Sequence, residues 1–92
     1  MEFVFTERAK NYIDKENIDS IYIKMSTVSS WSVHFRPLVK KGMPEFPDAF
    51  ELYEQSDLKI FYDYALAPTD KFLIGYQKIG SYELLVPGED RV

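Results

Sequence analysis

No cysteine occurs among the 92 residues of this chain, so neither a disulfide nor a thiolate-bound metal can hold the fold together. A chain of this length buries about 60–65% of the surface that its unfolded form exposes. The composition compensates with seven Phe, seven Tyr and one Trp, whose side chains bury large areas. We therefore expect one domain over residues 1–92 with an aromatic-rich core, and residues 89–92 as a frayed tail.

The periodicity of the apolar residues predicts one helix among several strands. Residues 1–5 alternate as a strand, and Thr6 is a suitable N-cap for a helix over residues 6–16. Further strands are expected over residues 21–26, 31–37, 50–54, 58–64, 72–76 and 81–86. This order of elements predicts an α+β domain.

Details of the middle segments refine this prediction. Pro37 cannot donate a hydrogen bond to a neighbouring strand, so its strand ends there or lies at a sheet edge. Lys40, Lys41 and Gly42 together indicate a turn. The segment 58–64 carries apolar residues on both faces, which is typical of a central strand.

The charges are distributed unevenly. The net charge of −4 disfavours a general nucleic-acid surface. Residues 21–44 hold four basic residues and no acid, whereas residues 45–70 hold seven acids and one lysine. Either a basic strand pair lies beside an acidic hairpin in one sheet, or the two halves form a bipolar surface that docks a partner.

The sequence also predicts where the protein resides. No apolar run is long enough to span a bilayer, and the first residues do not resemble a secretory signal. We therefore expect a cytoplasmic protein that contacts neither a membrane nor a nucleic acid.

The candidate site residues lie in one segment, and they are Ser29, Ser30, Trp31, His34 and Arg36. A hydrolase triad from a serine, His34 and an acid lacks the Gly-x-Ser-x-Gly turn, so we interpret both serines as loop residues and expect no enzyme. His34 is the single histidine, and a metal on it would depend on weak carboxylate ligands such as Glu51 or Glu54. We therefore expect no catalytic residue, no metal and no cofactor.

Trp31 stands beside polar residues, where the pattern does not require a core aromatic. It either closes one end of the core or forms a partly exposed anchor for a partner, a role in which tryptophan is enriched. His34 and Arg36 on the strand that follows suit a small anion or carboxylate. The segment 29–36 is thus predicted to bind a protein partner or a small anionic ligand.

The order of a strand, a capped helix, a second strand, a loop and a strand-rich remainder resembles the HesB-like fold of the A-type iron–sulfur carriers. Residues 3–10, FVFTERAK, are similar to the opening of that family, a strand followed by Thr, an acid and Ala-Lys. Residues 57–63, DLKIFYD, resemble its hairpin strand, where Gly-Ile/Val-Lys-Val-Tyr-Val-Asp is common. The resemblance implies a mixed β-sheet or partly closed barrel with one main N-terminal helix.

The resemblance also implies where metal ligands would lie. Such carriers hold iron or a cluster on a cysteine after the second strand and a Cys-x-Cys near the C-terminus, and a shorter branch has a Cys-Cys or selenocysteine pair in the loop after the second strand. The best counterpart of that pair here is Ser29-Ser30, and residues 87–92 contain no thiol. A serine alkoxide is far less available than a thiolate, so the fold is expected without its metal chemistry.

These observations predict a non-enzymatic module that binds a protein or a ligand through residues 29–36. One alternative is residual handling of iron through His34 and acids, related to iron–sulfur cluster assembly. Another is a small hydrolase that uses one of the two loop serines. A free sheet edge beside Pro37 allows a homodimer but does not require one.

Overall fold

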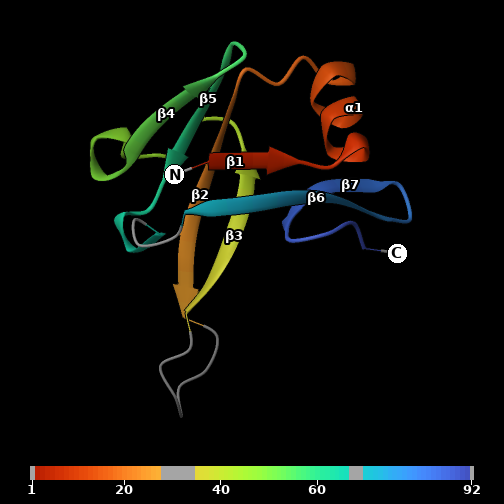
Figure 1. The fold of residues 1–92 in the computed structure, drawn as a ribbon. Coiled ribbons are helices and arrows are strands. Elements are labelled where there is room, and N and C mark those ends of the chain that lie inside the picture. The colour runs from red at the N-terminus through yellow and green to blue at the C-terminus, as the bar shows by residue number, and fades with distance from the viewer. Residues whose placement is uncertain (1, 28–34, 67–69, 92) are drawn as a thin grey trace.

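The computed structural model describes residues 2–27, 35–66 and 70–91, which form one α-helix and seven strands (Figure 1). In chain order these are β1 (Glu2–Phe5), α1 (Glu7–Lys15), β2 (Ser20–Thr27), β3 (Phe35–Lys41), β4 (Glu51–Gln55), β5 (Leu58–Tyr62), β6 (Lys71–Ile79) and β7 (Tyr82–Pro87). Two short 3-10 helices cover Pro47–Ala49 and Tyr64–Leu66. The predicted α+β class is confirmed.

The strands form two mixed sheets. One has the order β1-β6-β7, and the other has the order β3-β2-β5-β4. Strands β1 and β6 are parallel, as are β2 and β5, and the remaining pairs are antiparallel. Figure 1 shows β2 and β3 running across the direction of β1 and β6, with α1 beside the β6–β7 hairpin. The described strands do not close into a barrel, and the central position predicted for β5 is confirmed.

Local signals define the helix as the sequence predicts. The Thr6 hydroxyl oxygen accepts a hydrogen bond from the Ala9 amide at 3.2 Å, which satisfies one free donor of the first turn. Glu7 in the first turn and Lys15 in the last complement the helix dipole. Asn17 has a φ of 52°, the left-handed conformation that ends the helix.

Aromatic packing joins the two sheets into one core. Phe3 of β1 is 2% exposed, and its ring lies 5.5 Å from the rings of Tyr53 and Tyr62 and 6.2 Å from that of Phe72. Such tilted pairs contribute about 0.5–1.5 kcal/mol each beyond the area they bury. The largest fully buried side chains are Phe3, Ile21, Ile23, Ile60 and Ile74. The residues therefore belong to one small domain.

The structure decides between the two alternatives for Pro37 and corrects the turn expected after it. This strand continues through Pro37, which pairs with Met25, as far as Lys41. An edge strand such as β3 tolerates proline, because it has a neighbouring strand on one side only. The turn predicted at residues 40–42 is confined to Gly42, whose φ is 96°. The edge position itself is confirmed.

The structure also corrects the expected frayed tail for residues 89–91. The carboxylate of Asp90 accepts hydrogen bonds from the Thr6 hydroxyl at 2.6 Å and from the Tyr76 amide at 2.9 Å. The Arg91 amide donates to the Tyr76 carbonyl at 2.9 Å. The tail crosses β6 so closely at Gly75 that a β-carbon there would lie 2.6 Å from tail backbone atoms. Val92 lies outside the described residues.

The uneven charges meet in one sheet, because the basic strands β2 and β3 and the acidic hairpin β4–β5 belong to the same four strands. No ion pair joins the two halves within the described residues. In that part of the chain, the structure also contains no helix long and apolar enough to cross a membrane.

We expect Asp90→Ala to lower the free energy of unfolding by about 1–3 kcal/mol, because the Tyr76 amide and the Thr6 hydroxyl lose a shared acceptor. Urea unfolding followed by circular dichroism measures this. Glu89→Ala is the control, since Glu89 is exposed and should change stability by less than about 0.5 kcal/mol. Equal effects of the two substitutions would contradict the role of Asp90.

Candidate functional site

The site predicted from the sequence falls mostly on residues that the structure does not describe. Ser29, Ser30, Trp31 and His34 lie in the stretch 28–34 between β2 and β3. Arg36 is described, is exposed, and pairs with Ser26 near the start of β3. The grouping of these five residues therefore stays a prediction.

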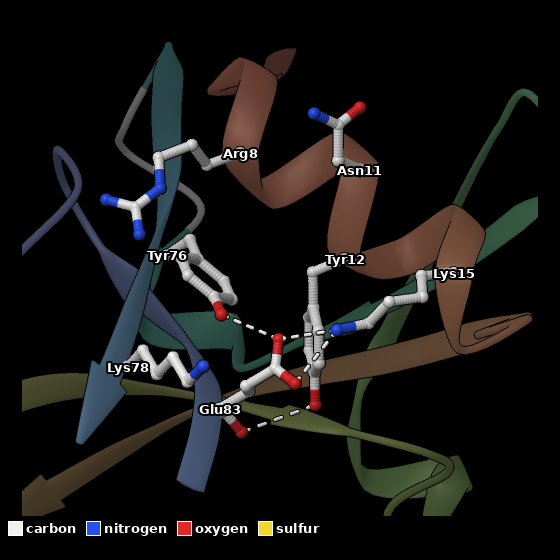
Figure 2. Close-up of a pocket in the computed structure, with 7 residues that line it drawn as sticks. All are labelled: Arg8, Asn11, Tyr12, Lys15, Tyr76, Lys78 and Glu83. Carbon is white, nitrogen blue, oxygen red and sulfur yellow. Dashed lines mark hydrogen bonds and ion pairs between the residues drawn. The ribbon is translucent and has the colours of Figure 1, made fainter. Parts of the chain in front are cut away.

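A polar pocket lies between α1 and the β6–β7 hairpin (Figure 2). Its volume is about 380 Å³, within the range of small-molecule sites. Helix α1 and the hairpin each supply part of its lining, which consists of Arg8, Asn11, Tyr12, Lys15, Tyr76, Lys78 and Glu83.

The spacing of the residues explains why these side chains converge. Positions 8, 11, 12 and 15 follow the three- and four-residue steps of one helix face. In β6, Tyr76 and Lys78 are two residues apart and so share one face of the sheet. Glu83 of β7 pairs directly with Lys78, which brings its side chain to the same face.

The carboxylate of Glu83 organises the floor of the pocket. It accepts hydrogen bonds from Lys15 Nζ at 2.9 and 2.8 Å and from the Tyr76 hydroxyl at 2.6 Å (Figure 2). The Tyr12 hydroxyl donates to the backbone carbonyl of Glu83 at 3.3 Å. Both tyrosines are buried, so the network fastens the helix to the hairpin through groups that also belong to the core.

These contacts fix the charges of the network at neutral pH. The hydrogen bond to Glu83 raises the pKa of Lys15, and it also raises the pKa of Tyr76. The hydrogen bonds from Lys15 and then from Tyr76 lower the pKa of Glu83. Lys15 is therefore a cation, Glu83 an anion and Tyr76 a neutral donor, and Glu83 is poorly suited to release or take up protons near pH 7.

Two further cations border the pocket. The Arg8 guanidinium lies 4.8 Å from the centre of the Tyr76 ring, a cation–π arrangement, and Lys78 lies opposite Glu83. Neither Arg8 nor Lys78 forms an ion pair with another described residue. The pocket thus holds three cations and one acid in a chain whose net charge is −4.

The pocket offers positive charge and hydrogen-bond donors, and its acid is already engaged by Lys15 and Tyr76. Within residues 2–27, 35–66 and 70–91, no three His, Asp or Glu side chains gather into a group that could hold a metal ion. The arrangement suits recognition of an anion better than acid–base chemistry.

Sequence reasoning did not identify this pocket. The helical spacing of Arg8, Asn11 and Lys15 is visible in the sequence and could have marked a polar face. The partner of that face could not be found in the same way, because Lys15 and Glu83 are separated by 68 positions.

Comparison with solved structures places the fold. The chain resembles SufA of Escherichia coli, involved in biosynthesis of iron–sulfur clusters, with a TM-score of 0.63 and 13% identity over 95% of this chain and 79% of that one. It also resembles a candidate Fe–S biosynthesis protein from Lactobacillus salivarius, with a TM-score of 0.54 and 14% identity over 98% and 95% of the two chains. The protein therefore has the HesB-like fold that the resemblance implied.

The family follows from the sequence itself. The chain belongs to the CC/Se motif containing family, whose model matches residues 1–86. No curated protein matches the chain. The family is described by a Cys-Cys or selenium motif, yet this member contains no cysteine.

We expect the loss of stability at acidic pH to depend on Glu83. Its pKa is lowered in the folded protein, so it stabilises the fold above its usual pKa and loses this contribution as pH falls through the lowered value. In Glu83→Gln this loss should disappear, so the unfolding free energy should depend less steeply on pH between about pH 6 and 2. This range brackets the pKa of a free glutamate, about 4.3. Denaturant unfolding at a series of pH values measures this.

Glu45→Gln is the matched control, because Glu45 is exposed and outside the pocket. The unfolding free energy of this variant should fall at acidic pH as it does in the unmodified protein. If Glu83→Gln lost as much unfolding free energy at acidic pH as the unmodified protein, the hydrogen bonds from Lys15 and Tyr76 would not explain the pH dependence of stability.

Proposed function

We propose that this protein is a non-enzymatic binding module on a HesB-like scaffold that has lost the thiols used to hold iron or a cluster. The observation that carries this proposal is the absence of cysteine in a member of a family described by a CC/Se motif. Thiolates are the usual ligands of iron–sulfur clusters, and no other residue type here replaces them as donors of comparable strength.

The structure supports a role in binding in two ways. The core is assembled from aromatic and aliphatic side chains, so the fold does not need a metal to hold it together. The pocket between α1 and β6–β7 presents donors and positive charge to solvent. A scaffold of this kind is suited to hold a partner or ligand without changing it chemically.

The binding segment proposed from the sequence remains residues 29–36, with a protein partner or a small anionic ligand. Arg36 supports this proposal in part, because it is exposed at the start of an edge strand. The edge of β3 also allows pairing with a second copy of the chain. A cytoplasmic location likewise remains a proposal from the sequence.

A second candidate function is residual handling of iron in cluster assembly. The likeness in fold to SufA and to the Lactobacillus protein favours it, since both are linked to iron–sulfur biosynthesis. At 13% and 14% identity this likeness extends to the fold, and the ligands would have to be oxygen atoms or His34. Metal retention separates the two candidates.

We expect the purified protein to retain no stoichiometric iron after anaerobic reconstitution with iron and sulfide and then desalting, because its available ligands are weak. Metal analysis and the visible absorption spectrum measure this. The double variant Ser29→Cys, Ser30→Cys is the control that restores a thiol pair, and it should retain more iron than the native chain. Stoichiometric iron on the native chain would overturn the proposed function in favour of iron handling.

The proposed binding segment has its own test. We expect Trp31→Ala combined with Arg36→Glu to lower the affinity for any partner captured from lysate at low salt. The affinity should fall by about tenfold or more, the loss typical of an interface anchor. Binding of the purified partner measures the change. Phe46→Ala combined with Lys59→Glu is the matched control, since both residues are exposed and lie outside the segment. Equal losses in the two double variants would remove residues 29–36 as the binding segment.

A further inference from the structure

We propose that the pocket between α1 and the β6–β7 hairpin binds the oxyanion group, a phosphate or a carboxylate, of a small organic molecule through Arg8 and Lys78. This inference deepens the proposed binding function and rests on it, because it assumes that the chain holds a ligand without transforming it. It assigns the ligand to a different place from residues 29–36.

The first argument is the balance of charge. Three cations and one acid line the pocket, whereas the whole chain carries a net charge of −4. The charge of the acid is partly offset, because Glu83 accepts hydrogen bonds from Lys15 and Tyr76. Arg8 and Lys78 form no ion pair with another described residue, so their N–H groups remain available to an anion, although the charge of Lys78 also acts on Glu83 across the strand pair.

The second argument is the placement of the two available cations. Arg8 comes from α1 and Lys78 from β6, and Figure 2 shows them on the same side of the pocket with the Tyr76 ring between them. Stacking of the Arg8 guanidinium on that ring, at 4.8 Å, restricts the long side chain before a ligand arrives. A planar guanidinium held in this way still offers N–H groups to an oxyanion.

The third argument is size. A volume of about 380 Å³ exceeds what a bare phosphate needs and falls within the range of small-molecule sites. The rings of Tyr12 and Tyr76 form part of the walls, and Asn11 adds an amide on the helix side. These features suit an organic body attached to the charged group, with the oxyanion near Arg8 and Lys78.

The roles of the four charged residues differ. Arg8 and Lys78 would contact the anion, whereas Lys15 holds Glu83 and keeps the helix joined to the hairpin. Glu83 opposes an incoming anion by its own charge. Its replacement by glutamine retains an acceptor for Tyr76 and raises the net charge of the pocket, so anion affinity should increase.

The experiment is a titration of the full-length, ¹⁵N-labelled protein with inorganic phosphate, phenyl phosphate and benzoate at constant ionic strength. We expect saturable shifts at the backbone amides of Arg8, Asn11, Lys78 and Glu83, with phenyl phosphate binding more tightly than inorganic phosphate. Sodium chloride replaces the probe in the reference titration, so a general salt effect is subtracted.

Matched variants test the site. Arg8→Gln and Lys78→Gln should each lower the affinity for phenyl phosphate by about tenfold, the loss expected when one charge-assisted hydrogen bond is removed. Lys10→Gln, on the same helix, and Lys71→Gln, on the same strand, remove the same charge outside the pocket and should leave affinity within about twofold. Glu83→Gln should tighten binding by about two- to fivefold.

Three outcomes would overturn the proposal: no saturable shift with any of the three probes, equal losses in the pocket and control variants, or weaker binding in Glu83→Gln. Failure of the proposed function would appear separately, as stoichiometric iron on the native chain. That measurement does not involve Arg8 or Lys78, so failure of the pocket assignment and failure of the proposed function are distinguishable.

Discussion

The packing of Phe3 is the interaction on which the rest of the structure depends. Its ring meets aromatic rings from β4, β5 and β6, and so joins the four-stranded sheet to the three-stranded one. A chain of 92 residues without cysteine has neither a disulfide nor a thiolate-bound metal to do this work. The first strand must therefore reach both sheets, and its position fixes where α1 begins, because the helix follows directly after β1.

The candidate pocket is a consequence of that placement. Once α1 lies on the β6–β7 hairpin, Tyr12 and Tyr76 bury their rings at the core and direct their hydroxyl groups to Glu83. The same residues thus stabilise the contact and line the pocket. The tail adds to this arrangement, since Asp90 joins the cap residue Thr6 to the backbone of Tyr76.

Local patterns were enough to predict much of the fold. The cap at Thr6, the helix over Glu7–Lys15 and the hairpin of β4 and β5 all follow from signals within a few residues. The errors arose where distant segments meet. The choice for Pro37 between a strand end and a sheet edge could not be made before its sheet neighbour was known. The contact of Asp90 with Thr6, which overturns the expected frayed tail, spans 84 positions. The pocket was missed for the same reason, because its lining comes from residues 8–15 and from residues 76–83, which are far apart in the sequence.

The absence of thiols is physically compatible with the fold because the motif positions and the core lie in different parts of the sequence. The residues proposed to replace the CC/Se motif fall in the connection between β2 and β3. The core takes its side chains from the helix and the strands themselves, including Ile23 of β2 and Val39 of β3, and the pocket network comes from α1, β6 and β7. Serine in place of cysteine at those positions would remove thiol ligands and leave the sequence at Phe3, Tyr12 and Glu83 unchanged. A core built from aromatic and aliphatic side chains does not use the motif positions, and a positively charged pocket in an acidic protein is the feature that would select an anion.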